Sequence, residues 1–104
     1  MILKDKKYSY RAFLDTGNTL IEPYQNRAVH LLFDPKLSQK FDKFIPVEYQ
    51  TINSSGFVRG VVFDKMIIDD KYEIDAPFIG FLNQKFFLDD ARIILNNQIS
   101  IFFE

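Results

Sequence analysis

Short apolar runs separated by turn residues recur along the chain, and this pattern constrains the fold to one built mainly from β-strands. Residues 8–14 alternate between two sets of side chains, as expected of a strand with one buried face. The segment 53–56, Asn-Ser-Ser-Gly, has the composition of a hairpin turn and lies between the extended runs 44–52 and 57–63. We therefore predict an all-β domain with a prominent hairpin.

The remaining runs fit the same fold class with one or two short helices. The pair Asp34-Pro35 is typical of a helix start, because Asp caps the first turn and Pro suits the first helical position. Residues 88–95 fit either a short helix or a strand. Further strands are predicted at 28–33, 65–69, 72–74, 77–81 and 98–103, with a polar turn at 69–71.

The composition predicts one domain, residues 1–104, and argues against several classes of function. The net charge is −1 and the basic residues are scattered, so nothing indicates a surface for nucleic acid. The chain has no cysteine, and its single histidine, His30, lies in an apolar run where we expect it to be buried or half-buried rather than to bind a metal or act as a catalytic base. No cofactor is expected. Twelve Phe residues in so short a chain indicate apolar surface left for a partner.

The segment Asp15-Thr16-Gly17 directly follows the apolar end of the predicted strand 8–14. Its hydroxyl-bearing, β-branched Thr can fix a turn by hydrogen bonding, and its Gly lets the backbone turn tightly. Such a turn can present a carboxylate to a cleft. The plain alternative is an Asx turn between two strands, with Asp15 hydrogen bonded to its own backbone.

Three features in order make the chain similar to retroviral-type aspartic peptidases. They are an apolar run into Asp15-Thr16-Gly17, a hairpin turn near Gly56, and an apolar-apolar-Gly sequence that ends at Gly80. The resemblance implies a retropepsin-like (half-pepsin) barrel or sandwich. In that family the hairpin is the flap over the substrate, so the segment 53–56 is expected to be a flap. The strand ending at Gly80 is expected to brace the catalytic loop.

A closer resemblance is to the peptidase domain of the sporulation sigma-E factor processing peptidases, the SpoIIGA family. It rests on residues 12–20, Ala-Phe-Leu-Asp-Thr-Gly-Asn-Thr-Leu, and on the acidic-Pro pair Glu22-Pro23. Further on, Ile45-Pro46 and the Gly-containing segment 55–58 occupy places similar to those in the family. This resemblance covers residues 8–95. It implies that the substrate is a sigma-factor precursor.

The resemblance also implies which residues form the site. The catalytic residues would be Asp15, Thr16 and Gly17, and the substrate would contact Ser54, Ser55, Gly56, Phe57, Ile79, Gly80 and Phe81. Such clefts bind an extended peptide as an added strand, so specificity is expected from alternating apolar pockets.

One Asp-Thr-Gly segment cannot run this chemistry alone. Aspartic peptidases need two carboxylates that share a proton, because like charges at that distance cannot both ionise. The second carboxylate is therefore expected from Asp15 of another copy, in a two-fold homodimer with the cleft at its interface. The terminal run 99–103 would either complete the core of one copy or join the sheet of the dimer.

The chain departs from the SpoIIGA pattern in two ways. Residues 94–97 read Ile-Leu-Asn-Asn where the family has an apolar-apolar-His-Pro signature. The family also carries an N-terminal multi-pass membrane domain, so we expect either the cytoplasmic domain of a longer membrane protein or a stand-alone relative. One alternative function stays open: a non-catalytic module that binds an extended peptide or assembles a complex on the same fold, with Asp15 as a relic.

Overall fold

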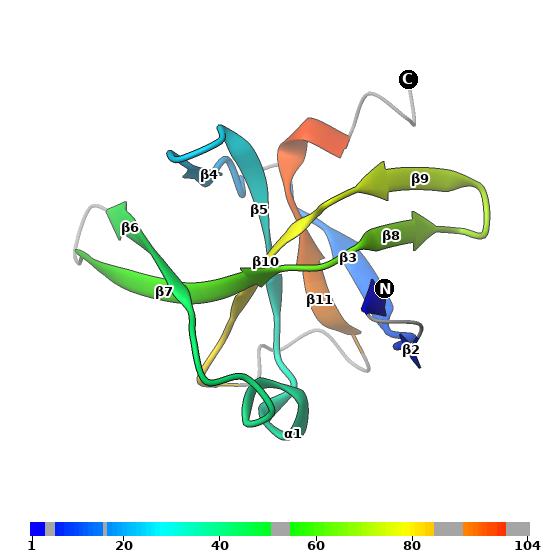
Figure 1. The fold of residues 1–104 in the computed structure, drawn as a ribbon. Coiled ribbons are helices and arrows are strands. Elements are labelled where there is room, and N and C mark those ends of the chain that lie inside the picture. The colour runs from blue at the N-terminus through cyan, green and yellow to red at the C-terminus, as the bar shows by residue number, and fades with distance from the viewer. Residues whose placement is uncertain (4–5, 16, 51–54, 85–90, 100–104) are drawn as a thin grey trace.

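Most of the predicted runs contain a strand, and three short strands, at 2–3, 6–7 and 21–22, were not predicted (Figure 1). The computed structural model describes residues 1–3, 6–15, 17–50, 55–84 and 91–99, without the side chains of Leu3 and Gln50. The described residues are mostly β-strand, as predicted, with helix α1 at Pro35–Ser38. The strands are β1 Ile2–Leu3, β2 Lys6–Lys7, β3 Arg11–Leu14, β4 Ile21–Glu22, β5 Arg27–Leu32, β6 Ile45–Gln50, β7 Ser55–Val62, β8 Lys65–Ile68, β9 Tyr72–Asp75, β10 Phe78–Phe81 and β11 Ala91–Leu95.

Two sheets make up the described fold. The larger one has the order β3-β11-β5-β10-β7-β6, with β4 paired to β5, and the smaller one has the order β2-β1-β8-β9. The two long arms β7–β8 and β9–β10 run through both sheets. Where the arms bend, Phe63 N donates to Pro77 O at 3.0 Å and Ala76 N donates to Asp64 O at 3.0 Å. These bonds keep the arms paired across the bend and join the two sheets.

The larger sheet has two parallel strand pairs at its centre, which meet along one antiparallel pairing. Strand β11 pairs parallel with β3, β10 pairs parallel with β5, and β11 and β5 run antiparallel between them. Both parallel pairs join strands far apart in the sequence, so their geometry depends on long-range contacts. One consequence is that the end of β3 lies beside the end of β11.

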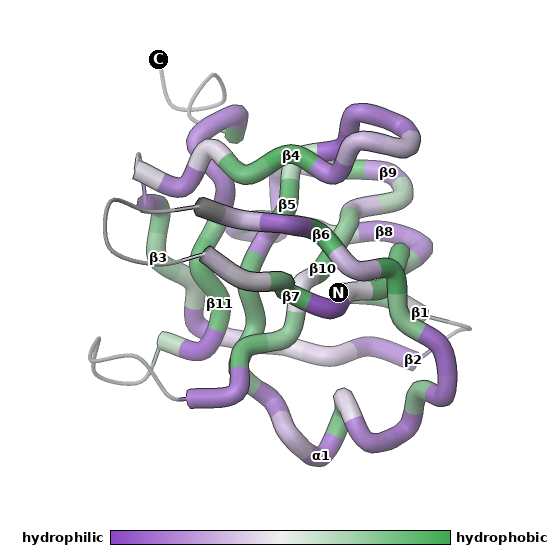
Figure 2. The backbone as a smooth tube through the Cα atoms, turned by 90° about the vertical axis from the view of Figure 1, so that its left-hand side faces the viewer, coloured by the Kyte–Doolittle hydropathy of each residue, from purple (hydrophilic) through white to green (hydrophobic). Residues whose placement is uncertain are grey.

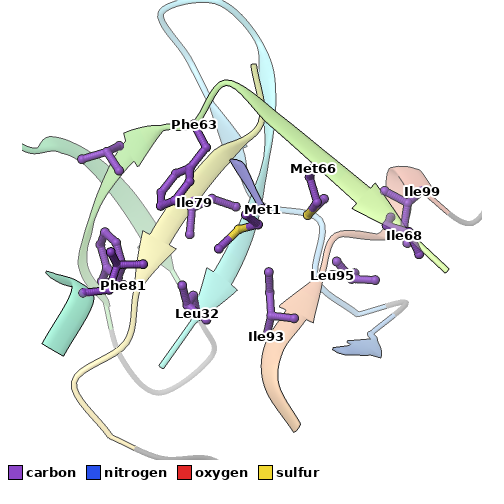
Figure 3. Close-up of a cluster of buried hydrophobic side chains, with 12 residues drawn as sticks. Met1, Leu32, Phe63, Met66, Ile68, Ile79, Phe81, Ile93, Leu95 and Ile99 are labelled. Carbon is purple, nitrogen blue, oxygen red and sulfur yellow. The ribbon is translucent and has the colours of Figure 1, made fainter. Parts of the chain in front are cut away.

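The main core lies between the two sheets (Figure 3). Phe63, Ile79 and Leu32 are among its fully buried side chains. The other members of this core are Met1, Leu37, Val61, Met66, Ile68, Phe81, Ile93, Leu95 and Ile99. A second, smaller cluster of Val29, Val47, Val58 and Phe78 forms on the other face of the larger sheet. Strand β10 is therefore buried on both faces.

Most of the Phe residues that the structure describes are at least partly buried. Phe41, beyond α1, packs against the rings of Phe63 and Phe81 with centroid distances of 6.1 and 5.8 Å. Phe44 packs against Phe81 at 6.1 Å and against Phe41 at 6.3 Å. Aromatic pairs at such distances add to the stabilisation from buried area. Among the described Phe residues, only Phe13 and Phe57 are strongly exposed.

Local signals predicted two elements well. Asp34 caps α1 by accepting a hydrogen bond from Leu37 N at 3.0 Å, and Pro35 occupies the first helical position. Asp69 and Asp70 both have positive φ, 56° and 55°, in the turn between β8 and β9. Asp tolerates this left-handed conformation better than most residues, which explains the polar turn at 69–71.

Other boundaries differ from the predictions. Strand β3 begins at Arg11 rather than at Tyr8, and Gly80 lies inside β10 rather than at its end. Residues 91–95 form a strand, which decides the open alternative for that part of 88–95. Residues 97–99 form a 3₁₀ turn, so the predicted strand at 98–103 does not begin at 98. Residues 88–90 and 100–103 lie outside the described residues.

Candidate active site

Asp15 begins the loop that follows β3, and the neighbouring strand β11 contacts the start of this loop. Leu14 is paired with Leu95, and Asp15 N donates to Leu95 O at 3.3 Å. The Asp15 carboxylate accepts a hydrogen bond from Gly17 N at 2.9 Å, and Asp15 O accepts one from Asn18 N at 3.0 Å. Thr16 lies outside the described residues. The loop thus folds back on the half-buried Asp15.

Gly17 lies close to the side chain of Asp15. A Cβ at this position would lie 3.2 Å from Asp15 Oδ1, closer than most Cβ contacts. A larger residue would therefore push against the carboxylate that the Gly17 N–H binds.

Asn18 ties the Asp15 loop to the body of the sheet. Its side chain is buried, with Nδ2 donating to Val29 O at 3.1 Å and Oδ1 accepting from Leu20 N at 3.3 Å. Its backbone O accepts a hydrogen bond from Asn97 N at 2.8 Å. The Asn of the Asp-Thr-Gly-Asn segment is thus a structural anchor, because it links the loop to β5 and to the chain just after β11.

Two further residues hold this region and were missed as site residues in the sequence. Asn96 has no exposed surface, and its Nδ2 donates to Leu20 O at 2.8 Å. His30, on β5, is buried as predicted and accepts a hydrogen bond at Nδ1 from Asn96 N, at 3.0 Å. The only signal for Asn96 was its place in the segment that departs from the family's His-Pro signature.

The β6–β7 hairpin has one buried face and one exposed face. On one face, Val47 and Val58 are buried, and farther out the Tyr49 ring covers Gly56, so that a Cβ on Gly56 would lie 2.9 Å from Tyr49 Oη. On the other face Phe57 is 67% exposed. The ends of β6 and β7 next to the turn lie to the left in Figure 2, as does β3. Figure 1, turned by 90°, separates them, with the hairpin at the left and β3 on the right, in keeping with the places of β3 and β6 at opposite ends of the strand order.

The structure corrects the placement of Gly56. It is not part of the turn, because it pairs with Tyr49 inside the strand ladder. Ser55 pairs with Gln50 and is exposed at the start of β7. Ser54 and the rest of the predicted turn, 51–54, lie outside the described residues.

The structure places the predicted substrate contacts of the strand 77–81 in the interior of the single chain. Ile79 has no exposed surface and Phe81 is 9% exposed, and both side chains belong to the main core, so neither lines a pocket open to substrate. Gly80 faces the side chains of Val58 and Leu31. The strand that braces the Asp15 loop is β11, whereas β10 pairs with β5 and β7.

Comparison with protein-family models, with curated proteins and with solved structures finds no match to this chain. Among the described residues, the helical part is far too short to cross a membrane.

Proposed function

We propose that this chain is an aspartic endopeptidase of the retropepsin type and that it works as a homodimer with one Asp15 from each copy. The observation that carries the proposal is the construction of the Asp15 loop. The bond from Gly17 N to Asp15 Oδ1 is equally that of an Asx turn. The additional ties from Leu95, Asn97 and Asn18 go beyond what a plain turn needs, and they support a carboxylate held in a fixed position.

The reaction would use the two Asp15 carboxylates as one acid–base pair. One carboxylate, ionised, takes a proton from a water molecule, which attacks the carbonyl carbon of the scissile peptide bond. The other, protonated, donates a hydrogen bond to the carbonyl oxygen. Protonation of the leaving nitrogen then completes hydrolysis. The pair titrates as a unit, so the pH profile reports on both copies of Asp15 together.

The β6–β7 hairpin would close over an extended peptide. Tyr49 lies on the same face as the buried Val47, so its ring would continue this apolar surface over the substrate. The resemblance to sporulation peptidases adds a sigma-factor precursor as the substrate and a membrane domain as the neighbour of this domain in a longer protein.

The test is cleavage of a mixed peptide library by the concentrated protein, from mildly acidic to neutral pH. The decisive variant is Asp15→Asn, which keeps the shape of the side chain and removes the shared proton. Asp42→Asn is the matched control, because it removes one carboxylate from an exposed position in the turn between α1 and β6. We expect cleavage by the wild type and by Asp42→Asn, and none by Asp15→Asn.

The same samples are to be examined by sedimentation, so that dimers are demonstrated in the solutions assayed. Cleavage that survives in Asp15→Asn would contradict the proposal. A dimeric protein that binds library peptides without cleaving them would favour the non-catalytic module.

A further inference from the structure

His30 binds a backbone group that lies far away in the sequence. It sits in the middle of β5, is 1% exposed, and lies opposite Ile79 of the parallel neighbour β10. Its Nδ1 accepts from Asn96 N at 3.0 Å. Because the donor is a backbone N–H, this bond requires Nδ1 to be unprotonated, so the imidazole is neutral and carries its proton on Nε2.

Asn96 is the centre of the turn that follows β11. Its Nδ2 donates to Leu20 O at 2.8 Å and to Val29 O at 3.3 Å, while its Oδ1 accepts from Gln98 N at 3.0 Å. Together with the hydrogen bond from Asn96 N to His30, these contacts give a partner to the backbone N–H of Asn96 and to both polar atoms of its side chain. A side chain so fully bound and so fully buried fixes its backbone in one conformation.

The neighbours of Asn96 on both sides hold the Asp15 loop. Leu95 O accepts a hydrogen bond from Asp15 N, and Asn97 N donates one to Asn18 O. The segment 95–97 is therefore hydrogen bonded to the loop at its first residue, Asp15, and at its last, Asn18. A shift of this segment would be transmitted to Asp15 through two backbone hydrogen bonds.

We propose that His30 and Asn96 are positioning residues for Asp15: neutral His30 fixes the segment 95–97, and this segment fixes the loop 15–18. The catalytic consequence rests on the proposed peptidase function. The coupling between His30 and the loop does not, since it follows from hydrogen bonds in one copy of the chain.

The surroundings of His30 favour its neutral form. Burial lowers the pKa of His30 to about 4. The charged groups that line the cavity beside His30 are Arg27 from β5 and Asp75 from β9. Arg27 forms an ion pair with Glu22, and Oδ1 of the exposed Asp75 lies 3.9 Å from Lys65 Nζ. Each of these two charged groups thus has an ion-pair partner other than His30. Protonation at Nδ1 would replace the acceptor by a second donor and break the bond to Asn96 N.

Two variants separate the hydrogen bond from the bulk of the side chain. In His30→Asn, Oδ1 stands close to the place of Nδ1 and can accept from Asn96 N, but it does not titrate. In His30→Leu, the acceptor is lost. Hydrogen exchange of the Asn18 and Asn97 amides reports on the loop without any need for catalysis.

The experiment follows these two amides by NMR in the whole chain as the pH is lowered. In the wild type we expect their protection to fall as His30 becomes protonated, at about the pH of its own ring titration. In His30→Asn that step should be absent. In His30→Leu, protection should be reduced already at neutral pH. A wild-type step that persists in His30→Asn, or protection in a folded His30→Leu equal to that of the wild type, would overturn the proposal.

The catalytic arm uses any peptide cleaved in an Asp15-dependent manner. We expect His30→Leu to lower kcat by about tenfold with little change in KM, and His30→Asn to restore most of that loss, because a misplaced carboxylate affects the transition state more than substrate binding. The acid limb of the profile should lose its His30 component in His30→Asn. If neither the wild type nor any variant cleaves a peptide, the proposed function fails. The amide measurements still decide whether His30 is coupled to the loop 15–18.

Discussion

At the residue scale, the Glu22 carboxylate is the charge most completely removed from water in the described part of the chain. It has no exposed surface. Burial by itself raises the pKa of Glu22, but Arg27 Nε at 3.1 Å and the N–H groups of Gln25 and Tyr24 stabilise the charged form, and the pKa lies below its ordinary value of 4.5. This carboxylate therefore stabilises the fold above that pH, and its contribution is lost as the pH falls through the folded-state value.

Replacing Glu22 with Gln tests this arrangement, because Gln keeps the size of the side chain and removes its charge. We expect the free energy of unfolding to fall by about 2 kcal/mol at neutral pH, the scale of hydrogen bonds to charged groups. The dependence of stability on pH below the ordinary Glu pKa should become weaker. Urea unfolding at neutral and acidic pH measures both effects. Glu48→Gln, at an exposed position in β6, serves as the control and should change stability little. Equal losses in the two variants would contradict the assignment.

His30 predicts a second pH effect in a different window. Its pKa is about 4 in the folded protein, below the ordinary 6.5, because burial disfavours the charged ring. The unfolded chain therefore takes up the proton first, and stability falls as the pH drops from 6.5 towards 4. The full loss is about 3 kcal/mol. We expect His30→Asn to lack this fall, which urea unfolding at a series of pH values would show. A wild-type stability that is constant across this window would contradict a neutral, buried His30.

At the scale of elements, the contact between β7 and β10 depends on two facing glycines. Gly60 is paired with Gly80. A Cβ on Gly60 would lie 2.5 Å from Ile79 O and 2.5 Å from Phe78 Cε1, whereas a Cβ on Gly80 would meet only side chains, the nearest being Val58 Cγ2 at 3.0 Å. The carbonyl of a paired strand cannot yield without breaking the ladder, but a Val methyl can rotate away.

We therefore expect Gly60→Ala to destabilise the protein by about 3 kcal/mol and Gly80→Ala by about 1 kcal/mol, since overpacking costs more where backbone must move. Thermal or urea unfolding of the two variants side by side measures the difference. Each variant is the control for the other, because both add one methyl group to the same strand pair. A larger loss in Gly80→Ala than in Gly60→Ala would refute the explanation.

The elements predicted best are those whose signals are local. The Asp34-Pro35 cap places α1 correctly, since the cap and the first turn are specified by adjacent residues. The hairpin arms were predicted at 44–52 and 57–63, and they form β6 and β7. The turn between β8 and β9 was predicted from its polar residues at 69–71, two of which adopt positive φ.

What the sequence did not specify is which strand lies beside which. The Asp15 loop was correctly predicted at the end of its strand. The apolar-apolar-Gly sequence that ends at Gly80, however, pointed to β10 as the strand that supports this loop. The true neighbour, β11, joins β3 through a pairing between residues about eighty positions apart, as in Leu14 and Leu95. Such a pairing leaves no mark in a local window. For the same reason the hydrogen bond between His30 and Asn96 could not be foreseen.

At the scale of the whole molecule, the proposal requires two chains to complete one site. Each chain carries one Asp-Thr-Gly segment, so a single copy supplies half of the acid–base pair. Activity should then rise faster than in proportion to protein concentration until the dimer is fully formed. This dependence by itself does not show that the copies share a site, because dimerisation can also stabilise two independent sites.

Mixing wild-type protein with Asp15→Asn separates these cases. In an equal mixture whose subunits exchange freely, roughly a quarter of the dimers are wild type and roughly half are mixed. A mixed dimer has one carboxylate and one amide and cannot share a proton, so the cleavage rate should fall to roughly a quarter of that of wild type at the same total concentration. Independent sites would leave roughly half. An equal mixture with Asp42→Asn should keep the full rate, and a fall to only half with Asp15→Asn would mean that each copy acts alone.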